Sequence, residues 1–235
     1  MTESQSYEIT ARNRVVRRSE RAHYDRETVH AILDSSMLCH IAYQIDGQPF
    51  CTPITFWRRD ETLYWHGSAA SRMLRSQIDK VEVCVTVALL DELVLTRSAF
   101  GHSVNYRAAM VFGRAQLVND LEETRQAAAD LLDKFYPGRS QIVRPPALSE
   151  LKQTKFIKMP IEQASAKIRK LPASAEPEAD HDSPVWAGII PLSFVVGEAV
   201  ACEKLVPGVQ MGTDLAAFRP GAKMDEILRR SPLRD

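Results

Sequence analysis

The chain has 235 residues, enough for one domain with decorations or two small ones, and long enough to bury a sizeable core. Its 30 basic and 30 acidic residues cancel, so no net field attracts nucleic acid or an anionic membrane, and neither is expected as a partner. No apolar run is long enough to span a bilayer and residues 1–20 are too polar for a secretory signal, so we expect a cytoplasmic protein.

The first half of the chain predicts a mainly β protein. Residues 1–22 carry few apolar anchors and several arginines, which predicts a flexible N-terminal arm. Asp25 is a helix N-cap candidate ahead of apolar residues at helical spacing, which predicts a helix over 26–36. Runs rich in β-branched and aromatic residues predict strands over 38–44, 51–57, 62–66, 81–90, 93–98 and 105–118. Residues 58–61 read as a hairpin turn, and Gly113 indicates a bulge.

The second half adds helices, one more strand and a tail. An apolar stripe predicts a helix over 122–135, which Pro137-Gly138 ends. The remaining predicted elements are a short helix over 149–153, a strand over 155–170 with Pro160 at an edge or bulge, an exposed acidic loop over 172–184, packed structure over 186–191, a further strand within 192–206, and a tail over 207–235 with a helix over 224–230. Short connections between strands favour one antiparallel barrel domain over 23–206.

Motifs for nucleotides, acyl transfer or metals are missing. The chain contains no GxGxxG, GxxxxGK[ST], GxSxG or HExxH. The six histidines do not cluster, and His40 and His66 on neighbouring strands make at most a weak pair, so we expect no metal. The four cysteines form no CxxC pair and lie among apolar residues, which predicts buried, reduced thiols.

The turn over 67–72 is the strongest local candidate for a binding site. Its small residues let backbone approach a ligand, and free N–H groups at the start of a helix over 71–77 hold an anion. Ser71 adds a hydroxyl and Arg72 adds fork-shaped donors, which suit a phosphate. An equally good interpretation is that Ser71 is only an N-cap and Arg72 only a solvated charge.

Three segments together resemble the pyridoxamine 5′-phosphate oxidase-like superfamily of FMN-binding split barrels: CTPITFW…LYWHGSAASRML, RSAFGHSVNYRAAMVFGRAQLV and SAKIR…PVWAGIIPL. The similarity covers about residues 20–205 and is greatest to the branch of nitroimidazole-reductase-like and flavin-nucleotide-binding proteins. The resemblance implies an antiparallel split β-barrel with flanking helices. It also implies a homodimer with FMN in the groove between its subunits.

The resemblance implies a set of flavin-binding residues. One strand whose backbone borders the isoalloxazine ring corresponds to Thr52, Pro53, Ile54 and Thr55. The return strand contacts the flavin tail through Trp65 and His66, and the phosphate-holding turn corresponds to Ser71, Arg72 and Met73, where the family often has a second basic residue instead of Met73. A strand from the other side of the site corresponds to Asn105, Tyr106, Arg107 and Ala108, and Trp186 begins a Trp-Gly-Gly-like segment.

Other interpretations of these residues stay open. Trp65 and Trp186 also fit core aromatics, and Tyr106 and Arg107 also fit a structural pair in a dimer interface. Pro53 cannot donate a hydrogen bond, so only its neighbours could tune the ring through backbone N–H groups.

The resemblance implies an FMN-dependent oxidoreductase acting on a small molecule, such as a nitroaromatic or quinone, with NADH or NADPH as reductant. True pyridoxamine phosphate oxidase activity is not expected, because no Arg-x-His arrangement follows Trp186. No residue pattern indicates a catalytic acid or base. The alternatives are a non-catalytic flavin-storage protein and a haem- or deazaflavin-binding split barrel, in which His66 or His40 would have a different role.

Overall fold

The computed structural model describes residues 5–173 and 182–230. The described chain is mainly antiparallel sheet, in the order β1-β8-β6-β7-β4-β3-β2-β5-β9 with a further pairing of β6 with β5. The strands are β1 (Ala22–His23), β2 (Leu38–Ile45), β3 (Gln48–Arg59), β4 (Thr62–Ser68), β5 (Val81–Leu95), β6 (Ser103–Leu117), β7 (Thr154–Pro160), β8 (Gln163–Arg169) and β9 (Gly188–Pro191). The predicted mainly β, antiparallel fold is confirmed.

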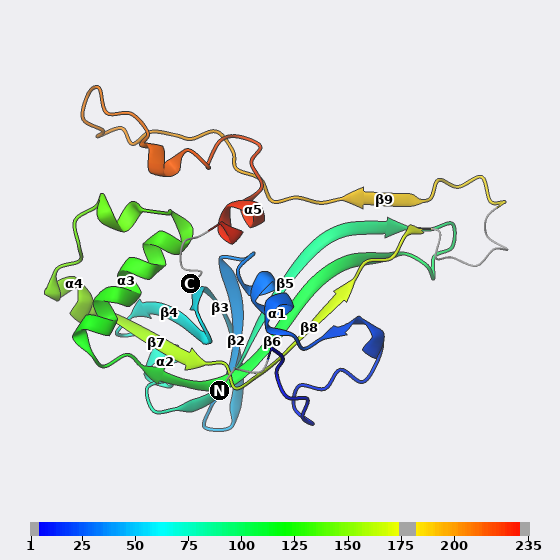
Figure 1. Ribbon diagram of the computed structural model, residues 1–235, viewed down its shortest axis with the longest axis horizontal. Helices are drawn as coiled ribbons and strands as arrows, with labels where there is room; N and C mark the ends of the chain where they lie inside the picture. The colour runs from blue at the N-terminus through cyan, green and yellow to red at the C-terminus, as the bar shows by residue number, and fades with distance from the viewer. Residues whose placement is uncertain (1–4, 174–181, 231–235) are drawn as a thin grey trace.

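The sheet closes on itself into a barrel. Each strand from β2 to β7 pairs antiparallel with its neighbours, and the pairing of β5 with β6 completes the ring. The long β5–β6 hairpin continues past the barrel, where β8 pairs with β6 and β9 pairs with β5. Figure 1 shows these four strands running side by side away from the barrel. Closure removes most sheet edges, and the projecting hairpin is covered on both sides by the two short strands.

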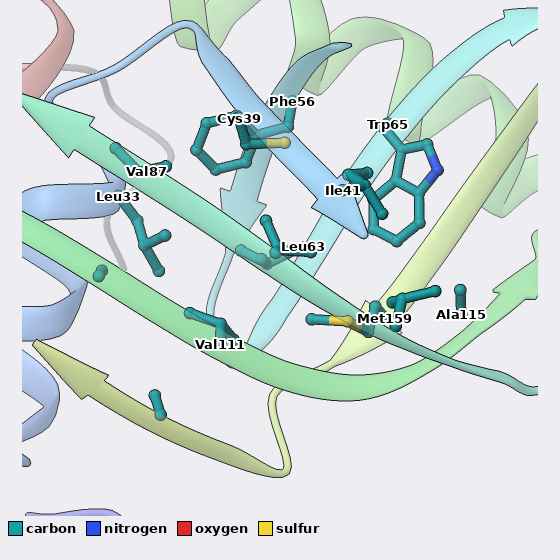
Figure 2. Close-up of a cluster of buried hydrophobic side chains, with 14 of the residues drawn as sticks. Leu33, Cys39, Ile41, Phe56, Leu63, Trp65, Val87, Val111, Ala115 and Met159 are labelled. Carbon is teal, nitrogen blue, oxygen red and sulfur yellow. The ribbon is translucent and has the colours of Figure 1, made fainter. Parts of the chain in front are cut away.

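Side chains that alternate inward along the strands fill the barrel. In β2 the exposed and buried residues alternate regularly from Leu38 to Gln44, as period-2 packing requires. Figure 2 shows the resulting core, in which Trp65 lies among apolar side chains from several strands: Cys39, Ile41, Phe56, Leu63, Val87, Val111 and Met159. Such burial is the main stabilising term of the fold, at about 25 cal/mol per Å² of apolar surface.

Helices pack against the barrel and cover one side of it. The helices are α1 (Arg26–Leu33), α2 (Arg72–Arg75), α3 (Leu121–Phe135), α4 (Leu148–Gln153) and α5 (Met224–Arg229). Asp25 caps α1 through the backbone N–H of Thr28 at 2.7 Å, as predicted. A second core lies between α3, α4 and the barrel, and there Trp57 packs edge-on against Phe156. Figure 1 shows α3 and α4 together on the β4–β7 side.

A buried ionic cluster connects these layers. The carboxylate of Asp34, at the end of α1, accepts hydrogen bonds from Arg58 of β3 at 2.6 Å and from Lys134 of α3 at 3.3 Å. Lys134 also donates to the carbonyl of Leu228 in α5 at 3.1 Å. The sequence pattern placed Arg58 in a polar turn, but β3 continues through Arg59 and the turn is Asp60-Glu61. The buried carboxylate explains why an arginine can lie inside a strand.

Two strand predictions are wrong in their boundaries. The separate strands expected over 81–90 and 93–98 form one strand, β5, because a register shift between Leu90 and Glu92 absorbs the polar break as a bulge. The single strand expected over 155–170 is the hairpin β7–β8. Pro160 ends β7, in keeping with its missing N–H donor.

Gly113 does not form the predicted bulge. It lies in regular register opposite Val83, and a Cβ added there would lie 2.2 Å from the carbonyl oxygen of Pro160. Close approach of two backbones therefore explains this glycine. The buried-thiol prediction is also wrong in part, because Cys51 and Cys202 are exposed while Cys39 is buried.

The chain ends differ from expectation as well. Within the N-terminal arm, Tyr7 and Asn13 are buried and anchor the arm to the rest of the chain, whereas most of residues 5–22 are exposed. No strand forms within 192–206 of the described chain, where an isolated bridge joins Val195 to Lys223. The C-terminal helix is present as α5. Most of the predicted acidic loop, residues 174–181, lies outside the described residues.

Candidate functional site

The turn that opens α2 presents an unpaired cation. Ser71 is the N-cap of α2, and its hydroxyl accepts a weak bond from the N–H of Leu74 at 3.5 Å, which leaves the hydroxyl proton free to donate. The Arg72 guanidinium lies 4.6 Å above the Phe50 ring and makes no ion pair among the described residues. Met73, next in the chain, is buried in the barrel core, so its side chain cannot reach a ligand at this turn.

Trp65 and His66 point to opposite sides of β4. Trp65 is fully buried and its indole N–H donates to Gln77 at 3.0 Å, so the core-aromatic interpretation holds for this side chain. His66 stacks on Phe156 in the second core, and its Nδ1 is buried with no hydrogen-bonding partner among the described residues. Burial lowers the pKa of His66 below its usual value of 6.5, which keeps the imidazole neutral at neutral pH.

The predicted ring-binding residues lie on β3, where their side chains alternate. Thr52 is half-buried and its hydroxyl contacts the Tyr43 hydroxyl at 3.1 Å, while Ile54 packs against the barrel core. Pro53 is exposed on the outer face of the sheet. Thr55 lines a cavity beside that face. The outer surface of this strand is therefore open to a ligand at Pro53 and Thr55.

The strand predicted to reach the site from the other side has its polar groups occupied. Asn105 is buried, donates to Glu92 at 2.6 Å and accepts from Arg169 at 2.6 Å. Arg107 forms a two-pronged pair with Asp91, and Asp225 of α5 lies 3.6 Å from it. Hydrogen bonding to Asp91 raises the pKa of Arg107 above its usual value. Both amide protons of Asn105 are used, by Glu92 and by the carbonyl of Leu171, whereas Asp91 occupies only part of the Arg107 guanidinium, and the contacts of both residues with a flavin stay predictions.

Two further predicted residues stand apart. Trp186 is 63% exposed, next to β9 and far along the projecting hairpin, so it is not a core aromatic. Tyr106 lies half-buried on β6 opposite Leu90. Neither side chain meets Ser71 and Arg72 within one chain, and the predicted residues form no single cluster.

The outer face of the barrel sheet is uncharged where β3, β2, β5 and β6 run side by side. One cross-strand row comprises Pro53, His40, Thr86 and Met110, and the next comprises Cys51, Ala42, Cys84 and Phe112. None of the side chains in these two described rows is a lysine, an arginine or a carboxylate. Arg12 of the N-terminal arm lies over Phe112 at the edge of the face. A broad surface without charges is typical of an interface.

Sequence reasoning missed several groups that shape this region. Phe50 lies under Arg72, and Asp91 and Asp225 neutralise Arg107. No local pattern signals these contacts, since each joins elements far apart in the chain. Among the described residues no group of histidine, cysteine or acidic side chains could hold a metal ion, and no helix is long and apolar enough to cross a membrane.

Comparison with known proteins places the chain in a family. Residues 25–168 match the family model described as pyridoxamine 5′-phosphate oxidase. The chain belongs to this family. No curated protein matches it. Membership was predicted from the resemblance and is confirmed.

Two solved structures are similar over nearly the whole chain. The flavocytochrome Anf3 from Azotobacter vinelandii is 37% identical, with a TM-score of 0.82, and the match covers 90% of this chain and 98% of that one. A FAD- and haem-binding protein from Mycobacterium smegmatis is 28% identical, with a TM-score of 0.80, covering 86% and 99%. A candidate 5-nitroimidazole antibiotic resistance protein from Bacteroides thetaiotaomicron shares the fold at 22% identity and a TM-score of 0.50, covering 63% and 86%. The first two matches extend beyond the part that the family model covers.

Proposed function

We propose that this protein is a homodimeric flavoprotein that binds FMN along the outer side of β3 and transfers electrons to a small molecule. The observation that carries the proposal is the unpaired Arg72 guanidinium, which lies over Phe50 on the strand that also carries the exposed Pro53 and, at the cavity, Thr55. The family membership supports it. A bound flavin would supply the redox chemistry, and the chain would supply position and shielding.

Each residue has a distinct role in this proposal. Arg72 and the Ser71 hydroxyl hold the phosphate through charge-assisted hydrogen bonds. Backbone between Pro53 and Thr55 borders the ring. The neutral His66 offers its orphaned Nδ1 to the flavin tail, since a buried nitrogen without a partner is costly unless a ligand satisfies it.

The test of the phosphate contact compares two ligands. Arg72→Ala should weaken FMN binding by about one to two decades, since a charged hydrogen bond is worth about 1.5–3 kcal/mol, and should leave riboflavin binding unchanged. Arg75→Ala, on the same short helix, and Arg107→Ala are the controls and should change neither ligand. Flavin fluorescence during titration of apoprotein measures both affinities. Equal weakening of FMN and riboflavin would place the phosphate elsewhere.

The proposed dimer uses the uncharged face, because a two-fold interface is self-complementary and buries such a surface. His40 lies in the first of the two rows, between Pro53 and Thr86, so His40→Glu would put a charge into the interface. Light scattering at micromolar concentration should report a dimer for the wild type and a monomer for His40→Glu. Gln44→Glu, at the end of the same strand, is the control. A monomeric wild type with flavin bound would refute the proposed dimer.

The second candidate function is that of a protein that binds haem as well as a flavin, or FAD in place of FMN. The observation that favours it is the 37% identity to a flavocytochrome over 90% of this chain, with a FAD- and haem-binding protein also matching. An absorbance spectrum of freshly purified protein distinguishes these cases, because haem gives a Soret band and flavin gives twin bands. Mass spectrometry of the released flavin distinguishes FMN from FAD.

Catalysis is tested separately from binding. Stopped-flow reduction of the bound flavin by NADH or NADPH, followed by turnover with a quinone or a nitroaromatic acceptor, supports an oxidoreductase. A flavin that binds tightly but is reduced by neither nicotinamide would support the storage protein instead.

A further inference from the structure

A cavity of about 760 Å³ opens beside the ring end of β3. Its walls come from the connection between α1 and β2, Thr55 of β3, the end of β5, Arg107 of β6, the segment after β9, and α5 with the residue before it. Figure 1 shows α5 between the barrel end and the strand β9 that leads into this segment. The volume lies within the range of about 300–1,000 Å³ that is usual for small-molecule sites.

The cavity offers an apolar surface. Side chains that supply this surface are Met37, Leu38, Leu90, Phe194, Met224 and Leu228. Most of its charged groups lie near an opposite charge: Arg107 pairs with Asp91 and lies near Asp225, and Lys223 lies 3.8 Å from Glu226. Glu92 accepts a hydrogen bond from buried Asn105 at 2.6 Å. A ligand that carries charge would have to break these contacts, whereas a neutral apolar one would not.

The position of the cavity links it to the proposed flavin. Thr55 belongs to the strand proposed to border the isoalloxazine ring, and it also lines the cavity. Leu38 pairs with Thr55 across β2 and β3 and lines the cavity too. A molecule in the cavity would therefore lie at the ring end of the flavin, away from Arg72.

We propose that this cavity binds a neutral, flat, apolar ring compound of the quinone class. The position of this compound beside a flavin rests on the proposed function, whereas the cavity is observed independently of it. A dianionic macrocycle such as haem fits the lining less well, because its carboxylates need uncompensated cations, whereas Arg107 already faces two carboxylates and Lys223 lies near Glu226.

The test uses menadione as the probe and two matched pairs of variants. Leu90→Glu and Phe194→Asp each put a carboxylate into the cavity, from β5 and from the segment after β9. Leu205→Glu and Val200→Asp are the controls, because these exposed residues lie outside the cavity lining. Phe194 belongs to neither of the two uncharged rows, so its effect is not confused with a charge placed in them. Calorimetry on apoprotein and on FMN-loaded protein measures menadione affinity, and FMN affinity is measured separately.

One menadione should bind per chain, at least tenfold more weakly in Leu90→Glu and Phe194→Asp and unchanged in both controls. Absent binding, or equal weakening in a control, would overturn the proposal. Hemin that binds with a Soret shift, and loses it in Phe194→Asp, would also overturn it by giving the cavity to a charged macrocycle. If FMN fails to bind while menadione binding follows the predicted pattern, the proposed function is wrong and the cavity assignment stands.

Discussion

Removing the carboxylate of Asp34 should destabilise the protein more than any exposed substitution. Asp34 and Lys134 have side-chain exposures of 2% and 3%, and Arg58 has 9%. Asp34→Ala leaves both cations buried without this partner, and breaking a buried ion pair costs about 3–5 kcal/mol. For a chain of this size the melting temperature should fall by about 6–20 °C, since each kcal/mol shifts it by about 2–4 °C.

The assay is urea unfolding followed by circular dichroism, with thermal melts in parallel. Asp79→Ala, at an exposed aspartate, is the control and should change the free energy of unfolding by less than about 0.5 kcal/mol. Adding Lys134→Met to Asp34→Ala removes one stranded charge and should recover part of the loss. A loss below about 1 kcal/mol for Asp34→Ala, or a double variant less stable than the single one, would refute the reasoning.

Two further predictions follow from other contacts. Burial alone would raise the pKa of Glu61, but hydrogen bonds from His30, Tyr7 and Arg26 outweigh it and lower the pKa from 4.5 to about 2. The stability that the ionised Glu61 contributes is fully present above pH 4.5 and is lost as the pH falls toward 2. Glu61→Gln should therefore flatten the dependence of the unfolding free energy, measured with urea, on pH between those values. Gly113→Ala should cost about 1–3 kcal/mol by overpacking against Pro160, whereas Gly197→Ala, with open space around it, should not. Equal urea unfolding midpoints for the two variants would contradict this prediction.

The parts of the fold that depend on residues close in the sequence could be predicted from local chemistry. The Asp25 cap and the strand over 38–44 depend on residues within a few positions, and both appear as predicted. Arg58 was misplaced in a turn because its stabilising partner, Asp34, lies 24 residues away. Gly113 was misread because the backbone that crowds it belongs to Pro160, on another strand.

The sequence predicted the kinds of side chain at the candidate site better than it predicted the contacts that these side chains make. Adjacent residues on a strand face opposite sides, so Trp65 and His66 could not both reach one ligand through their side chains. Asn105 and Arg107 carry donors that suit a flavin, but their partners, Glu92 and Asp91, come from the paired strand. A sequence shows which hydrogen-bond donors are present. Whether another residue already accepts from them depends on the tertiary structure.

The spacing along β3 separates the roles proposed for its two ends. Arg72 lies over Phe50, and the cavity begins at Thr55, five residues further along the same strand. At about 3.3 Å per residue these positions are about 17 Å apart. Within one chain, a phosphate held by Arg72 would therefore lie at the Phe50 end of the strand, away from the cavity that Thr55 and Arg107 line. An extended flavin along β3 would place its ring at Pro53–Thr55, next to an apolar cavity, so one strand would position the cofactor and open onto the compound that exchanges electrons with it.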